Sequence, residues 1–134
     1  MIKVRDLDGN SINWNINGCF QNASAKSSYH LAARKLIKEI YPTMHVLEEV
    51  PVYIRKNEIV YLDFYIPLIK KCIEVHGEQH YKFVPHFHGS LMDFAKAKKR
   101  DLEKKQWCEV NNFSFIELPY NSQDNWKDLI DEIS

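Results

Sequence analysis

The sequence predicts a mixed α/β (α+β) fold, in which a central mixed sheet is flanked by helices. Three observations predict it: one stretch repeats apolar residues at helical spacing, three later stretches are rich in β-branched and aromatic residues, and a helix and a strand follow them. The predicted order from residue 28 is α-β-β-β-α-β, after an N-terminal β-hairpin and before a short closing helix. Such a mixed order favours helices packed against the faces of one sheet.

The N-terminal region predicts a β-hairpin and a loop. Two alternating stretches within residues 2–16 flank Asp8–Asn10, a run of turn-forming residues. Residues 17–26 are rich in Asn, Gly, Ser and Ala, which is typical of a loop.

The first helix is expected over residues 28–40, where the apolar residues fall on one stripe. Ser27 can cap its start, and Pro42 ends it. A strand follows over residues 45–54. Pro51 within that strand indicates an edge position or a bulge, because proline cannot donate a hydrogen bond to a neighbouring strand.

The second and third strands are expected over residues 59–66 and 71–76, as an antiparallel hairpin closed near Pro67. Ser90, with Asp93 three residues later, predicts the start of a helix that runs to about Gln106. The stretch 113–118 alternates and predicts the last strand, and apolar residues within 126–133 predict the closing helix.

Composition limits the class of protein. The chain has 134 residues, of which 45% are hydrophobic and 27% charged, as is ordinary for a soluble globular protein. No apolar run approaches the roughly 20 residues that a membrane helix needs, and the polar first residues do not resemble a signal peptide. We therefore expect a cytoplasmic protein (host-cell cytoplasm, if a phage encodes it), without membrane contact. Three widely spaced cysteines argue against a disulfide framework.

The charges are unevenly distributed in a chain with no net charge, which has 18 basic and 18 acidic residues. Residues 94–105 hold six basic and two acidic side chains, whereas residues 106–134 hold six acidic side chains and one lysine. The basic stretch is either a solvated helix face or a surface for nucleic acid.

The candidate site lies on the predicted strand hairpin. Side chains alternate along a strand, so Glu74 and His76 point to one face, and Asp63 on the paired strand can join them. Acids in such apolar strands are costly unless they are paired or bind metal. Two carboxylates, with the backbone carbonyl of Val75, form an oxygen-rich cradle for Mg²⁺ or Mn²⁺. The ion would polarise a phosphodiester and activate water, and His76 would position or deprotonate that water.

These residues resemble the PD-(D/E)xK nuclease superfamily, whose core has the same order of elements. Its signature is an aspartate on one strand and an acid-x-Lys on the next, which here reads Asp63 and then Glu74-Val75-His76. Histidine in the lysine position is similar to very-short-patch repair endonucleases and to EDxHD homing endonucleases of bacteriophages. The resemblance covers residues 27 to 120 and implies a restriction-endonuclease-like core. It also implies that Asp63 is the main metal ligand.

Four further positions take roles from this resemblance. His76 and His80 resemble the two active-site histidines, one of them a candidate general base, and Asp101 resembles the second aspartate of EDxHD. His30 stands where relatives carry a glutamate on the first helix. Either Glu48 or Glu49 could lie near the site instead.

The implied partner is double-stranded DNA. His86 and His88 lie in a loop that either touches DNA or packs on the protein. A further alternative is a zinc site formed by these histidines and Cys108. Lysine and arginine hold phosphates without reading sequence. The candidate DNA-binding residues of the basic stretch are Lys96, Lys98, Lys99, Arg100, Lys104 and Lys105.

The sequence therefore predicts a magnesium-dependent DNA endonuclease of homing type, from a phage or mobile element. Residues 1–26 would form the hairpin and loop, and residues 27–134 the catalytic core of one compact domain. A homodimer or a fused DNA-reading domain would complete target recognition. The alternatives are a mismatch or repair nicking enzyme, an inactive relative that binds nucleic acid or a protein, and a structural phage protein with an incidental acidic pocket.

Overall fold

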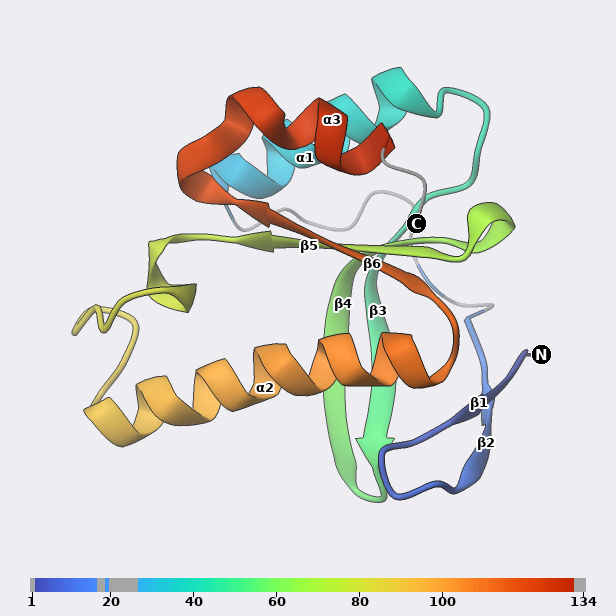
Figure 1. The fold of residues 1–134 in the computed structure, drawn as a ribbon, viewed down its shortest axis with the longest axis horizontal. Helices are drawn as coiled ribbons and strands as arrows, with labels where there is room; N and C mark the ends of the chain where they lie inside the picture. Colours follow the sequence, from blue (N-terminus) through green and yellow to red (C-terminus); the bar gives the residue numbers. More distant parts are fainter. Residues whose placement is uncertain (1, 17–18, 20–26, 132–134) are drawn as a thin grey trace.

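A computed structural model describes residues 2–16, 19 and 27–131 of the chain. It confirms the predicted mixed sheet flanked by helices and the N-terminal hairpin (Figure 1). The strands are β1 (Ile2–Arg5), β2 (Ser11–Trp14), β3 (Leu47–Arg55), β4 (Glu58–Ile66), β5 (Lys71–His76) and β6 (Ser114–Pro119). The helices are α1 (Ser28–Ile40), α2 (Leu91–Val110) and α3 (Trp126–Asp131), with 3-10 turns at Pro67–Ile69, Glu78–His80 and Tyr120–Asn125.

The four-stranded sheet has the order β3-β4-β5-β6. Strands β3, β4 and β5 pair in antiparallel fashion, as predicted for the hairpin of β4 and β5, whereas β6 runs parallel to β5. Helix α2 makes the crossover that a parallel pair needs. Pro51 lies on the edge strand β3, where its missing N–H costs the sheet little.

Side-chain caps set the starts of the two long helices. The Ser27 hydroxyl accepts a hydrogen bond from the backbone N of His30 at 3.1 Å, and the Ser90 hydroxyl accepts one from Asp93 at 3.2 Å. Both predicted caps are therefore confirmed. Helix α2 continues beyond the predicted Gln106 to Val110, and the chain turns after it through a left-handed Asn112 with φ of 60°.

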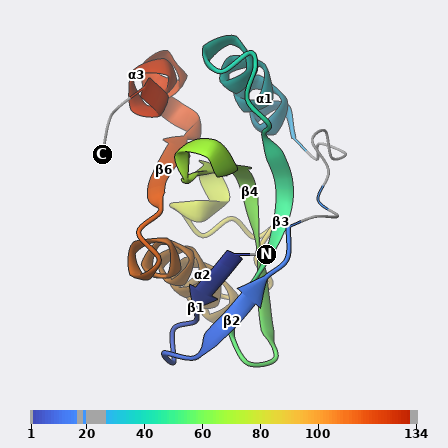
Figure 2. The same cartoon turned by 90° about the vertical axis from the view of Figure 1, so that its right-hand side faces the viewer.

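The N-terminal hairpin packs beside β3 and α2 (Figure 2). Its turn is held by Asp6, whose carboxylate accepts hydrogen bonds from the backbone N–H groups of Asp8 and Asn10. The Trp14 ring lies 5.0 Å from the Trp107 ring, which anchors the hairpin on α2. The predicted loop at 17–26, apart from Cys19, and the last residues of the predicted closing helix lie outside the described residues.

Two apolar clusters hold the helices on the sheet, with α1 and α3 on one side and α2 on the other (Figure 1). Complete burial of a large apolar side chain contributes about 1.5–3 kcal/mol, so these clusters fix where the site residues lie. None of the described helices is both long and apolar enough to cross a bilayer. The cluster under α2 includes Val50, Val52, Leu62, Tyr65, Trp107 and Cys108, and the other includes Ala33, Ile37, Phe64, Ile73, Leu118 and Trp126.

Candidate functional site

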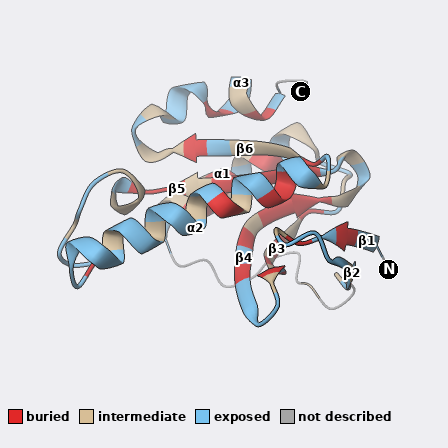
Figure 3. Cartoon of the chain, turned by 60° about the horizontal axis from the view of Figure 1, so that its bottom comes forward, coloured by how far each residue is buried: buried red, intermediate tan, exposed pale blue. Residues whose placement is uncertain are grey.

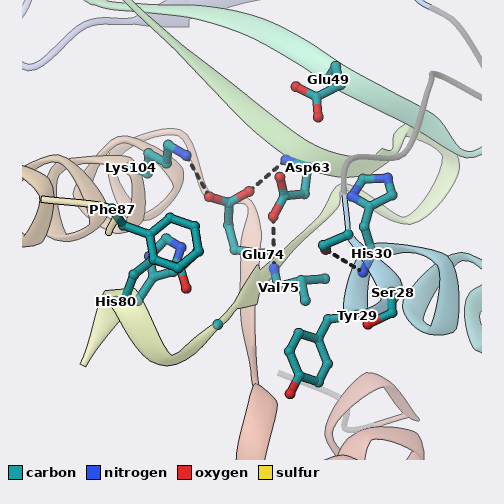
Figure 4. Close-up of a pocket in the computed structure, with 13 residues that line it drawn as sticks. Ser28, Tyr29, His30, Glu49, Asp63, Glu74, Val75, His80, Phe87 and Lys104 are labelled. Carbon is teal, nitrogen blue, oxygen red and sulfur yellow. Dashed lines mark hydrogen bonds and ion pairs between the residues drawn. The ribbon is translucent and has the colours of Figure 1, made fainter. Parts of the chain in front are cut away.

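The carboxylates of Asp63 and Glu74 lie side by side where β4 and β5 stop pairing. The backbone register of the two strands ends at Phe64 opposite Ile73. Beyond it, the Glu74 carboxylate accepts a hydrogen bond from the backbone N–H of Asp63 at 2.6 Å, and the Asp63 carboxylate accepts one from Val75 at 2.9 Å (Figure 4). Each acid thus replaces a bond of the strand ladder, and the predicted convergence of the two acids is present.

Burial shapes the charge of this pair. Glu74 is 1% exposed, and burial followed by the neighbouring charge of Asp63 raises its pKa to about 7. Burial also raises the pKa of Asp63, although the hydrogen bond from Val75 opposes that change. A carboxyl group with a pKa near neutrality can both carry and release a proton at physiological pH.

Lys104 supplies the positive charge of the site. Its Nζ donates a hydrogen bond to Glu74 at 2.7 Å, and its side chain is 13% exposed. Burial acts against the charged form, but the charge of Glu74 and this hydrogen bond raise the pKa of Lys104 above its usual value. Lys104 therefore lies in the site and does not belong to the exposed basic surface to which the sequence assigned it. A signal for this was available, since Lys104 precedes the buried Trp107 by three residues on one face of the helix.

Glu49, and not Glu48, faces the site. Suitable atoms of His30, Glu49 and Asp63 all lie within 4.8 Å of one another, a spacing that one cation can bridge. Glu49 has a φ of 51°, a left-handed conformation that costs a residue with a side chain of the order of 1–3 kcal/mol. Strain of this kind is common at functional sites, so the backbone at Glu49 is a second indication of a specialised position.

Glu48 does not line the cavity but positions His30. Its carboxylate lies 2.7 Å from His30 Nε2 and accepts two hydrogen bonds of 2.9 Å from Arg34. The His30 ring also stacks on Phe64, with ring centroids 4.5 Å apart. These contacts leave the His30 Nδ1 as the ring nitrogen without a bond to Glu48.

A cavity of about 420 Å³ joins these groups, as Figure 4 shows. Its walls come from the start of α1, from β3, β4 and β5, from the loop after β5 and from α2, so elements far apart in the sequence meet there. The carboxylate oxygens in these walls are hard donors, the kind that Mg²⁺ and Mn²⁺ prefer. The polar and aromatic lining includes His30, Glu49, Asp63, Glu74, His80, Phe87 and Lys104, together with Val75.

The histidines form a second group next to this cavity. His80 Nδ1 lies 2.7 Å from Asp101, and the His80 ring stacks on the His76 ring at 4.1 Å. His76 lies 3.4 Å from Glu117, and its hydrogen bond is the main cause that lowers the pKa of Glu117 to about 2. The predicted single patch is therefore divided: Asp63 and Glu74 line the cavity, whereas His76 lines a neighbouring hollow. His80 lines both.

Two loop predictions change in the structure. His88 is 6% exposed, and its Nδ1 accepts a hydrogen bond from the backbone of Val84, so it holds the loop and does not present itself to DNA. His86 is exposed. Cys108 is buried in the core, and among described residues no group with metal-binding geometry includes a cysteine, which is contrary to the zinc alternative.

The remaining basic residues lie along the first part of α2, which is exposed on most sides (Figure 3). Two of them, Lys98 and Lys105, line the neighbouring hollow together with His76 and His80. The exposed set is Lys96, Lys98, Lys99, Arg100 and Lys105.

Comparison with known proteins gives relatives without an assigned activity. The chain is 43% identical over 63 residues to uncharacterized protein 307L of Invertebrate iridescent virus 6, which covers 47% of this chain and 32% of that protein. It is 39% identical over 64 residues to uncharacterized protein 094L of Frog virus 3, covering 47% of this chain and 41% of that protein. The matched segment thus spans less than half of each of these relatives. No family model and no solved structure matches the chain.

Proposed function

We propose that the chain is a metal-dependent DNA endonuclease that hydrolyses phosphodiester bonds. The observation that carries this proposal is the group of Asp63, Glu49 and His30 in one cavity with the buried Glu74–Lys104 pair. Acids held next to one another in an apolar sheet destabilise the fold unless a cation or a proton offsets them, so their retention favours a chemical role.

The donor set fits a hard divalent cation. Asp63 and Glu49 offer carboxylate oxygens, and His30 adds an imidazole that Mn²⁺ tolerates. Val75 lines the same cavity and would add its backbone carbonyl. A Mg²⁺ or Mn²⁺ ion held by these residues would polarise the phosphodiester and make a bound water molecule more acidic. The residues of the chain then need only to orient the substrate and to move a proton.

Lys104 and His80 take these two tasks. Lys104, held by Glu74, would supply a fixed positive charge to the pentacoordinate transition state at phosphorus, which gains negative charge. Asp101 holds His80 through Nδ1, which leaves Nε2 as the basic nitrogen for a water molecule in the cavity. The exposed basic residues of α2 supply contacts to the DNA backbone that do not depend on sequence.

The test is cleavage of supercoiled plasmid DNA with Mg²⁺, Mn²⁺ or EDTA. Asp63→Asn and Glu49→Gln should each reduce cleavage by at least a hundredfold, whereas Asp128→Asn, at an exposed acid of α3, should cut like the wild type. The ratio of nicked to linear product separates repair-type nicking from homing-type cleavage. Folded wild-type protein that cuts no DNA with either metal, or a fully active Asp63→Asn, would refute the proposal and favour an inactive binding relative.

A further inference from the structure

The hairpin of β3 and β4 carries an exposed aromatic face. Exposure alternates along β3 from residue 50 to residue 54, as expected for a strand with one face on the core. On the outer face, Tyr53 is 53% exposed, Tyr61 49% and Ile59 42%. Tyr53 lies directly opposite Ile59, and Pro51 lies opposite Tyr61, so the three side chains form one patch.

This patch continues from the candidate site. Asp63 follows Tyr61 by two residues on β4, and Glu49 precedes Pro51 by two residues on β3. Two residues along a strand span about 6.6–6.8 Å, so Tyr61 lies next to the acids of the site and Tyr53 one further step away. The residues that alternate with them along the two strands, such as Val52, Val60 and Leu62, are packed in the core.

Folding gives no reason for these rings to lie outside. Within the described residues, neither tyrosine hydroxyl has a hydrogen bond and neither ring makes an aromatic contact. Large apolar side chains that stay exposed next to a polar cavity are typical of surfaces that a ligand covers. The ligand must also reach Asp63, because the patch and the site share one face of the hairpin.

The chemistry of the patch fits bases and not phosphates. Its three members are uncharged, and the exposed basic residues of α2 lie outside it. Nucleobases stack on aromatic side chains whatever their sequence, but only when they are unpaired and open to the protein. From Lys104 in the site, α2 carries its basic residues about 12 Å away to Lys96, at 1.5 Å per residue. Helix and hairpin leave the site in different directions (Figure 1).

We propose that Tyr53, Ile59 and Tyr61 bind unpaired nucleotides next to the scissile bond. The substrate is then a DNA with a junction, whose duplex part lies along α2 and whose single-stranded part lies along the outer face of the β3–β4 hairpin. This inference rests on the proposed function, because the site defines where the two parts meet. It narrows the substrate from duplex DNA in general to duplex DNA with a single-stranded arm.

Fluorescence anisotropy with labelled oligonucleotides tests the inference in the presence of EDTA, where no cleavage occurs. The probes are a blunt 20-base-pair duplex and the same duplex with a ten-nucleotide single-stranded tail on either end of one strand. The wild type should bind one tailed duplex at least tenfold more tightly than the blunt duplex. Tyr53→Ala/Tyr61→Ala should lose about tenfold in affinity for the tail per ring removed and leave the blunt duplex unchanged.

Matched variants separate the ring from the surface. Tyr53→Phe/Tyr61→Phe keeps the rings and should bind like the wild type. Leu68→Ala, at an apolar side chain that is 77% exposed elsewhere, should also bind like the wild type. Equal affinity of the wild type for blunt and tailed duplexes overturns the inference. An unchanged affinity of the alanine variant for the tailed duplex also overturns it. If the wild type self-associates in light scattering and the alanine variant does not, the patch joins two copies of the chain instead.

The outcome is distinguishable from failure of the proposed function. Binding in EDTA is independent of cleavage, so loss of tail binding in the alanine variant supports the nucleotide surface even if no DNA is cut. Conversely, cleavage of plasmid that depends on Asp63, with no preference for a tail, keeps the nuclease proposal and rejects this one.

Discussion

Replacement of Lys104 by methionine tests the charge arrangement of the site most directly. Methionine keeps the length and apolar stem of lysine but leaves Glu74, which is 1% exposed, without its positive partner. Removal of one partner from a buried ion pair destabilises proteins by about 3–5 kcal/mol. We expect a loss of this size in the free energy of unfolding at pH 8, where Glu74 in the wild type is mostly ionised.

The pKa of Glu74 determines how the stability of the fold changes with pH. Burial raises the pKa of Glu74 from 4.5 to about 7, so the folded state binds this proton more tightly than the unfolded state does. The protonated Glu74 therefore contributes its full stability below pH 4.5, and this contribution is lost as the pH rises through about 7. The shift between the two pKa values corresponds to about 3 kcal/mol in the free energy of unfolding. At pH 5 Glu74 is mostly protonated, so Lys104→Met should cost much less there than at pH 8.

The double variant Glu74→Gln/Lys104→Met supplies the control. It removes both charges, so it should recover much of the lost stability at pH 8 and show a smaller decrease between pH 5 and pH 8 than the wild type. Urea unfolding followed by tryptophan fluorescence measures these values, because Trp14, Trp107 and Trp126 are buried. If Lys104→Met lowers the free energy of unfolding by the same amount at both pH values, the loss comes from packing and the reasoning is refuted.

Three further predictions concern activity and binding. Asp101→Asn should reduce the rate of plasmid cleavage by about 10²–10⁴-fold without changing the affinity for DNA, because an amide can donate to His80 and so no longer fixes the tautomer of its ring. An unchanged rate in single-turnover kinetics would exclude His80 as the base. Glu49→Gln should weaken Mn²⁺ binding in calorimetry by at least tenfold, while Glu39→Gln on the exposed face of α1 should not. A variant with glutamine at four exposed positions of α2 should lower the salt dependence of DNA affinity by roughly 0.9 in logarithmic slope per lost phosphate contact, and an unchanged slope would move the duplex away from α2. The four positions are Lys96, Lys98, Lys99 and Arg100.

Local signals account for how much of the fold the sequence predicts. The first helix starts at the predicted cap because Ser27 satisfies a free backbone N–H, and β5 spans the predicted residues 71–76. Strand alternation and the short hairpin also bring Asp63 and Glu74 together. These features depend on neighbours within a few residues, which periodicity and turn residues describe well.

Tertiary contacts account for what the sequence analysis missed. Lys104 faces the site because α2 packs against β4, although its sequence neighbours are mostly charged and exposed. Glu49 faces the cavity in a left-handed conformation, which no local pattern of a strand indicates. His88 is buried between Phe83 of its own loop and Phe94 of α2. Each of these positions depends on a contact between elements or within an irregular loop.

The hydrogen bonds from the backbone to the two acids give both positions a structural role that does not depend on catalysis. The backbone N–H of Val75 has the Asp63 carboxylate as its acceptor, and the N–H of Asp63 has Glu74. An aliphatic residue at either position would leave a main-chain donor without a partner, so both positions are constrained by the fold alone. We expect any relative that shares this fold but lacks the proposed activity to carry asparagine or glutamine there.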